Sequence, residues 1–294
     1  IRDRWCSIGL VVCLVMTMVD YQVLKKVSVL ALVLALLLLL ALMIPGIGLE
    51  RNGARRWLQL PGTTFQPSEF AKLAVIVALA HYCERKGRGM GTFKYGLLIP
   101  GMVLTLFLGL IFIEPDWGAT VLLATVCGLM LFLAGTKLRF IIPPVIALGA
   151  AGGFLLSQNT VRLNRIMSWL DPEGTKQGVG YQAWQSLIAL GSGGTTGLGL
   201  GNGRQKLGFV PEHQPDFIFS VIGEELGLVA TLGVVLGFVL FVVCGAFIAM
   251  RSRDFFGYLL AAGMTLLIGL QAFINIGVVT VSYTHLTLPT ILLV

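Results

Sequence analysis

Eight apolar runs separated by polar segments constrain this sequence more than any other feature. A helix crosses a bilayer with about 20 apolar residues, or with fewer when the span is short or tilted. The chain is 56% hydrophobic and only 12% charged, whereas soluble domains carry about 25% charged residues. The runs lack the alternation of barrel strands. We therefore predict an all-α fold, a polytopic membrane helical bundle of about eight transmembrane helices: Trp5–Val19, Val27–Ile44, Phe70–Tyr82, Tyr95–Ile113, Trp117–Ala134, Phe140–Ser157, Phe217–Met250 and Phe255–Val281.

Residues 1–294 are predicted to form a single membrane domain with one large extracytoplasmic loop, 158–215. Within this loop, Gly180–Leu190 is amphipathic and is expected to lie along the membrane surface. The run Phe217–Met250 is too long for one straight crossing, so we expect it to tilt or to project from the bilayer.

Basic residues indicate the orientation. The short loops 20–26, 83–94, 135–139 and 251–254 hold ten Lys and Arg residues, and the opposite side also holds ten. Five of those opposite residues lie in the long loop 158–215, and long loops carry little weight in the positive-inside rule. The short-loop side is therefore predicted to be cytoplasmic. The cations left on the outer side suggest a bound anion.

Several classes of site are disfavoured. The five cysteines have no metal-like spacing and are interpreted as small core residues. The glycines of 191–203 match neither a Walker A nor a dinucleotide fingerprint. The net charge of +7 is spread over both membrane faces, which argues against nucleic acid.

Two outer segments carry unexplained polar residues. In the first, Ser68 is a plausible helix N-cap, and Glu69 and Lys72 are spaced to pair on one helix face. That pair could line a functional site or simply neutralise itself. In the second, Glu114 and Asp116 occupy a tight turn between two runs, where turn chemistry explains Pro115 but not two acids.

Four motifs occur in order along the chain: Gly53-Ala54-Arg55-Arg56-Trp57; Gln66-Pro67-Ser68-Glu69-Phe70-Ala71-Lys72; Gln185-Ser186 with Gly191-Ser192-Gly193-Gly194; and Pro211-Glu212 with Asp216-Phe217-Ile218-Phe219 and Glu224-Glu225-Leu226-Gly227. They resemble the FtsW/RodA (SEDS) family of bacterial peptidoglycan polymerases. The segment 199–207 is closer to the cell-division FtsW branch.

The resemblance implies ten membrane helices, of which this chain corresponds to helices two to nine. It also implies polymerisation of glycan strands from lipid II, by inverting transfer from an undecaprenyl-diphosphate-linked donor in cell division. The expected location is the bacterial inner membrane, multi-pass, with an extracytoplasmic active face. Expected partners are lipid II, a class B penicillin-binding transpeptidase and other divisome membrane proteins.

By the same resemblance, Asp216 is the catalytic residue, as a base that accepts the proton of the attacking sugar hydroxyl or as a ligand of a divalent cation, Mg²⁺ or Mn²⁺. Its alternative role is a helix N-cap. Glu224 lies eight residues further on, ~12 Å along a helix, beyond the roughly 5–9.5 Å of paired glycosidic carboxylates. We therefore expect Glu224 and Glu225 to be structural or to line an inner polar cavity. The expected substrate contacts are Arg55, Arg56, Glu69, Lys72, Glu114, Arg204, Lys206 and Glu212.

Some alternatives remain open. Arg204 and Lys206 could bind lipid headgroups, and the whole chain could be a lipid II flippase or a non-catalytic divisome scaffold. The family usually has His-Thr before the aspartate, where this chain has Gln214-Pro215. The tail 281–294 fits nothing in the family and is interpreted as foreign, which questions the activity of this fragment.

Overall fold

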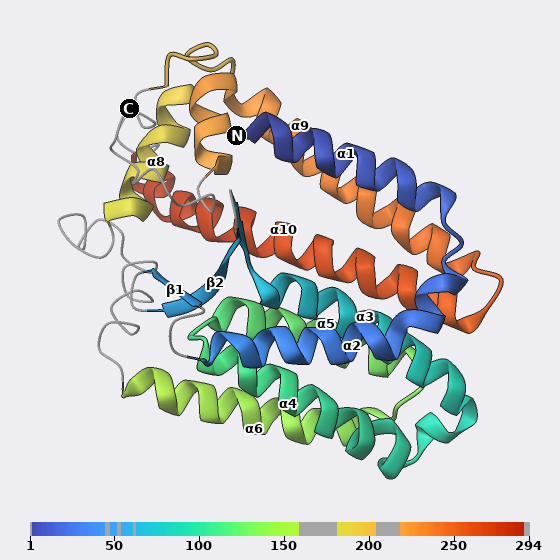
Figure 1. Ribbon diagram of the computed structural model, residues 1–294. Helices are drawn as coiled ribbons and strands as arrows, with labels where there is room; N and C mark the ends of the chain where they lie inside the picture. The colour runs from blue at the N-terminus through green and yellow to red at the C-terminus, as the bar shows by residue number, and fades with distance from the viewer. Residues whose placement is uncertain are drawn as a thin grey trace. The chain divides into compact units, whose positions relative to one another are not determined.

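A computed structural model describes residues 2–44, 48–51, 54–60, 63–158, 181–203 and 218–290. These residues are mostly helical (Figure 1). Each of the eight predicted apolar runs coincides with a helix, which confirms the polytopic helical fold. The helices are α1 (Arg2–Met18), α2 (Gln22–Leu42), α3 (Pro67–Lys86), α4 (Ile99–Ile113), α5 (Trp117–Leu133), α6 (Leu138–Ser157), α8 (Tyr181–Gly193), α9 (Ile218–Met250) and α10 (Phe255–Thr290).

Four helical segments are both long and apolar enough to cross a membrane: Gln22–Leu42, Lys94–Ile113, Ile218–Met250 and Phe255–Val279. Segments of α1, α5 and α6 are shorter apolar helices. Helix α3 is more polar than these segments, because its sequence includes several charged residues, yet about half of its side chains are buried in the protein. Protein packing therefore takes the place of lipid around much of α3.

The chain divides into two compact units. The first comprises residues 1–142 and 245–267, and within it α2 packs along α3 and α4 packs against α5. Its core includes Ile76 of α3 and Met130 of α5. A Cβ at Gly263 of α10 would lie 2.8 Å from Ile76 and 2.7 Å from the Met130 sulfur. Only glycine lets this part of α10 approach so closely.

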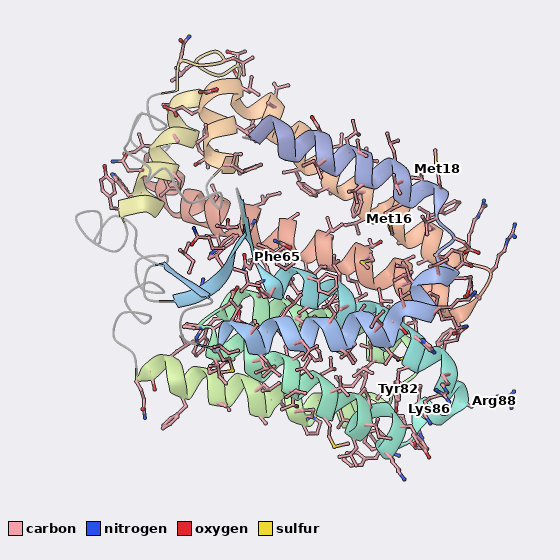
Figure 2. All side chains as sticks on the ribbon, viewed as in Figure 1. Met16, Met18, Phe65, Tyr82, Lys86 and Arg88 are labelled. Atoms are coloured by element: carbon pink, nitrogen blue, oxygen red, sulfur yellow. The ribbon has the colours of Figure 1, made fainter. Side chains whose placement is uncertain are left out.

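A small antiparallel sheet in the first unit, of order β1-β2-β3, was not predicted. Strand β1 (Gly48–Arg51) pairs with β2 (Ala54–Leu60), which pairs with β3 (Thr63–Phe65). The dipeptides 52–53 and 61–62, Asn-Gly and Pro-Gly, connect the strands. Asn-Gly between two short strands is a strong hairpin signal. The sheet leads directly into α3, with Phe65 near one end of that helix and Tyr82, Lys86 and Arg88 near the other (Figure 2).

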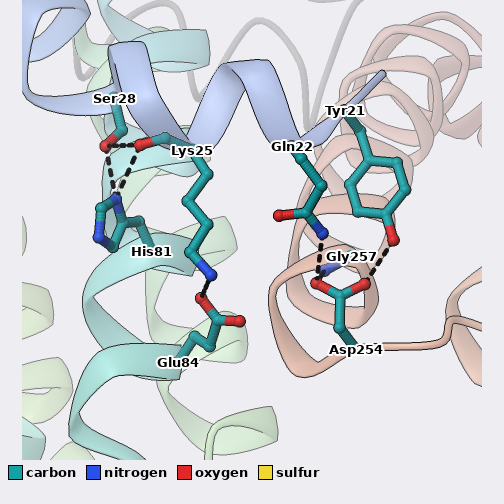
Figure 3. A network of polar contacts seen from close by, with 8 residues as sticks. All are labelled: Tyr21, Gln22, Lys25, Ser28, His81, Glu84, Asp254 and Gly257. Atoms are coloured by element: carbon teal, nitrogen blue, oxygen red, sulfur yellow. Dashed lines mark hydrogen bonds and ion pairs between the residues drawn. The ribbon is translucent and has the colours of Figure 1, made fainter.

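Polar contacts also join helices of the first unit (Figure 3). The Tyr21 hydroxyl and the Gln22 amide donate hydrogen bonds to the carboxylate of Asp254. The same carboxylate accepts a bond from the backbone N–H of Gly257, in the first turn of α10. Asp254 therefore caps α10 and holds it to Tyr21 and to the first residue of α2.

The second unit comprises residues 143–244 and 268–294. The predicted amphipathic helix within the long loop is present as α8. Helix α9 is broken at Gly227, whose φ of 74° and ψ of −171° are not helical. The long seventh run is therefore interrupted by a break at Gly227, which was not predicted; its expected tilt or projection from the bilayer stays a prediction. Helix α10 continues through 281–290, so the part of the atypical tail that is described is helical.

Candidate functional site at the start of α3 and the α4–α5 turn

Helix α3 begins one residue earlier than predicted. Its N-cap is Gln66, in an extended conformation, and Pro67 occupies the first helical position, where the fixed φ of proline suits a helix start. The prediction of Ser68 as N-cap is therefore wrong. The Ser68 hydroxyl instead accepts a hydrogen bond of 3.0 Å from the Gln66 side-chain amide. Glu69 lies in the first turn, as predicted.

Glu69 and Lys72 form the predicted pair on α3. The Lys72 Nζ lies 2.9 Å from each of the two Glu69 carboxylate oxygens. The Lys72 side chain is only 2% exposed, whereas that of Glu69 is 53% exposed. A buried ammonium is tolerated when a carboxylate compensates it. Lys72 is thus a neutralised cation inside the first unit, and Glu69 is the member of the pair that solvent and solutes can reach.

The turn between α4 and α5 is bound to both the sheet and the start of α3. Asp116 is the N-cap of α5, where one carboxylate oxygen accepts from the Ala119 backbone N–H at 3.1 Å. The other oxygen accepts from the Gln66 amide at 3.3 Å. Arg56 of β2 donates from Nε to the Glu114 carbonyl at 3.0 Å, and from an Nη to the Pro115 carbonyl. Asp116 therefore has a structural role, and Arg56 fixes the turn.

Glu114 is the least ordinary group in this cluster. It is 6% exposed, and neither carboxylate oxygen has a hydrogen-bond partner among the described residues. The pKa of Glu114 is raised to about 8, first by burial and then by the charge of Asp116, while the charge of Arg56 opposes this rise. The residue follows the last residue of the apolar segment Lys94–Ile113. Glu114 is thus a buried acid that holds its proton well above the usual range, with free capacity to donate to or accept from a ligand.

Replacing Glu114 with glutamine is expected to raise the thermal stability and flatten its pH dependence. Between about pH 4.5 and 8 the native carboxyl keeps a proton that the unfolded chain has lost. The free energy of unfolding of the wild type therefore falls as pH rises through this window. Glutamine cannot ionise, so this loss disappears. The measurement is Tm from pH 5 to 8.5, with Asp20→Asn, an exposed acid, as control. Equal slopes for wild type and Glu114→Gln would contradict the assignment.

In the second unit, the glycine-rich segment 194–203 packs on the break in α9. Backbone N–H groups of Leu198 and Gly199 donate to the carbonyls of Glu224 and Glu225 at 3.0 and 2.9 Å. The Gly201 N–H donates to the Glu225 carboxylate at 3.2 Å. Gly197 has a φ of +80°, and a Cβ there would overlap the Glu225 carbonyl. Glu225 is therefore structural, as expected, and these glycines serve close backbone packing.

Several predicted site residues lie wholly or partly outside the part of the chain that the structure describes. Asp216, Arg204, Lys206 and Glu212 lie outside the described residues. Arg55 is in β2, but its side chain is likewise not described. The structure brings Arg56, Glu69, Lys72 and Glu114 into the first unit, near the contact between the start of α3 and the α4–α5 turn. It adds Gln66, which the sequence analysis quoted within a motif but did not select as a site residue.

A divalent cation would need several oxygen ligands. Among the described residues, no three His, Cys, Asp or Glu side chains are grouped closely enough to hold one. The one candidate ligand named from the sequence, Asp216, lies outside the described residues, and the described residues by themselves do not form such a site.

The fold and the polar cluster together define a multi-pass membrane protein with buried charge inside its helical bundle. The family model of the FtsW, RodA and SpoVE cell cycle proteins matches residues 2–291. The chain therefore belongs to this family.

Named relatives agree with this family. The probable peptidoglycan glycosyltransferase FtsW of Trichlorobacter lovleyi is 41% identical over 273 residues, which cover 93% of this chain and 72% of the relative. The stage V sporulation protein E of Bacillus subtilis is 37% identical over 97% of this chain and 78% of its own length.

Solved structures share the fold. A chain from a peptidoglycan synthase complex that coordinates polymerization and crosslinking has a TM-score of 0.77 at 23% identity, covering 95% of this chain and 77% of its own. The rod shape determining protein RodA of Thermus thermophilus has a TM-score of 0.64 at 23% identity, covering 92% of this chain and 72% of its own. Both likenesses support the polytopic fold predicted from the apolar runs.

Proposed function

We propose that this protein is a peptidoglycan glycosyltransferase that polymerises glycan strands from lipid II in bacterial cell division. The observation that carries the proposal is the 41% identity, over 93% of the chain, to a relative named peptidoglycan glycosyltransferase FtsW. The polar cluster of the first unit is built from two of the motifs that carry the resemblance, at Arg56 and at Gln66 to Lys72. A buried, paired charge inside a membrane bundle is costly and is commonly kept for function.

In the proposed reaction, Asp216 accepts the proton of the attacking sugar hydroxyl. That oxygen forms a bond to the anomeric carbon of the donor, and the bond from this carbon to the lipid diphosphate breaks with inversion. The lipid diphosphate leaves with the electron pair of that bond. General base catalysis of this kind contributes typically about 10²–10⁴-fold.

The leaving diphosphate requires nearby positive charge. Lys72 is already neutralised by Glu69, so we assign the diphosphate contact to Arg55, Arg204 and Lys206, and a weaker contribution to Arg56, which also holds the α4–α5 turn. Glu69, which is half exposed, and Glu212 would accept hydrogen bonds from sugar hydroxyls or peptide N–H groups. Glu114, largely protonated at neutral pH, would donate one.

A divalent cation, Mg²⁺ or Mn²⁺, remains a separate proposal. Asp216 would contribute to holding it, and its charge would offset that of the diphosphate. Chelation should then abolish polymerisation and re-addition of metal should restore it. Full activity after exhaustive chelation would overturn this part alone.

The proposed setting is the bacterial inner membrane, with the active face extracytoplasmic. This orientation follows from the basic short loops that are expected to face the cytoplasm. The proposed partners are a class B penicillin-binding transpeptidase and other divisome membrane proteins.

The test is the fate of fluorescent lipid II presented to the purified protein in vesicles. A polymerase lengthens the glycan, which a gel resolves as a ladder. A flippase moves lipid II to the opposite leaflet without a ladder, and a scaffold does neither. Translocation without polymer, or no change to the lipid at all while the protein remains folded, would refute the proposal.

A further inference from the structure

A cavity of about 240 Å³ lies between α2, α3 and α4 in the first unit. Its wall is mostly apolar. Two of the wall residues, Val29 and Val103, are 65% and 39% exposed, so the cavity opens to the outside at this point. Aliphatic side chains from all three helices make up the wall: Val29, Leu32, Val75, Ala78, Val103 and Leu104.

Polar residues also line the cavity, and most are already satisfied. His81 Nδ1 lies 2.7 Å from the Ser28 hydroxyl and 3.0 Å from the Lys25 carbonyl (Figure 3). The Tyr82 hydroxyl donates to the Tyr95 carbonyl at 2.9 Å. Arg85 differs, since it is exposed and makes no hydrogen bond or ion pair within the described part of the chain. An unpaired guanidinium therefore borders an apolar cavity.

Other cations lie close to Arg85, and the acid next to it in the sequence, Glu84, is already paired with another residue. Lys86 lies over the ring of Tyr95, 4.6 Å from its centroid, and Arg88 is exposed nearby on the chain. Glu84 is engaged by Lys25 in an ion pair. Figure 2 shows Tyr82, Lys86 and Arg88 together, at the end of α3 away from the sheet. This end of the helix is thus cationic, and the carboxylate next to Arg85 in the sequence is occupied.

We propose that this cavity binds an acidic phospholipid, with part of one acyl chain between α2, α3 and α4 and the phosphate on Arg85. Basic pockets between transmembrane helices recognise anionic headgroups, and each Lys or Arg near the surface contributes about 1 kcal/mol. The cavity is smaller than the about 300–1,000 Å³ of compact ligand sites, which suits a segment of chain. The site lies at the opposite end of α3 from Glu69 and is independent of the proposed glycosyl transfer.

The test is native mass spectrometry of the purified protein with phosphatidylglycerol or phosphatidylcholine of identical acyl chains. Wild type should retain phosphatidylglycerol preferentially. Arg85→Gln should reduce that preference about fivefold, which corresponds to one cation. Arg88→Gln is the matched control, because it removes an exposed cation that does not line the cavity. It should lower the preference by less than Arg85→Gln does.

A second pair of variants separates the chain from the headgroup. Val103→Trp should fill the cavity and weaken retention of both lipids. If the tryptophan impairs folding, Ala78→Leu replaces it as the test and should weaken retention to a smaller extent. Absence of a headgroup preference in wild type, or equal losses in Arg85→Gln and Arg88→Gln, would overturn the proposal. The proposal would also be overturned if filling the cavity changed the association of this protein with other proteins and left lipid retention unchanged.

Discussion

Asp216→Ala is expected to lower glycan polymerisation by at least about a hundredfold, and by up to about 10⁴-fold, while the protein remains folded. The proposed reaction has a single base, and the hydroxyl of a sugar is a poor nucleophile until its proton is removed. Initial rates of polymer formation from lipid II, on a gel, give the measurement.

Three further variants sharpen this prediction. Asp216→Asn keeps the size of the side chain but cannot accept a proton, so it should be as inactive as alanine. Asp216→Glu keeps the carboxylate and should retain part of the activity. Asp20→Asn removes an exposed acid at the start of α2 and should leave the rate unchanged. If Asp216→Asn stays active, the base is another group, and an N-cap role for Asp216 becomes the better explanation.

The second large effect, on the free energy of unfolding, is expected from variants of the pair Glu69 and Lys72 on α3. Its size should differ between the two residues. Glu69→Gln leaves the ammonium of Lys72 buried without compensation. Breaking a fully buried pair in this way costs about 3–5 kcal/mol. Because Glu69 is half exposed, we expect the lower end of that range. Lys72→Met leaves a carboxylate that water can still solvate, so its cost should be well below that of Glu69→Gln.

The double variant Glu69→Gln with Lys72→Met tests the same claim from the other direction. It removes both charges, and it should recover most of the stability that Glu69→Gln loses. Thermal unfolding in one detergent compares the four proteins, and the lipid II assay shows whether the recovered protein is active. Equal destabilisation by the two single variants would contradict the burial of Lys72, and failure of the double variant to recover would contradict the pairing.

The sequence predicts the helices well because the membrane leaves few choices. A long apolar run in a bilayer must satisfy its backbone internally, so each run forms a helix whatever its detailed packing. The pair of Glu69 and Lys72 is likewise predictable, since residues three apart share a helix face. The direction of the burial, with lysine inside and glutamate outside, depends on which neighbours surround α3 and does not follow from spacing.

Other features depend on contacts distant in the sequence. The sheet escapes prediction because its strands are short and polar, although Asn52-Gly53 carries a hairpin signal. Serine is a good cap, which favours Ser68, but Pro67 fits the first helical turn and moves the boundary to Gln66. The glycines of 194–203 match no nucleotide-binding fingerprint, and the close contact of Gly197 with the break at Gly227 of α9 becomes visible only in the structure. Glu114 is unusual already in the sequence, but its burial requires the packed structure.

The most direct test of the central claim is the stoichiometry of the reaction on lipid II labelled in both the sugar and the lipid. Glycosyl transfer predicts one lipid diphosphate released for each disaccharide added to the strand, with an inverted anomeric configuration in the new linkage. Lipid II that crosses the bilayer with both labels still joined would contradict the account.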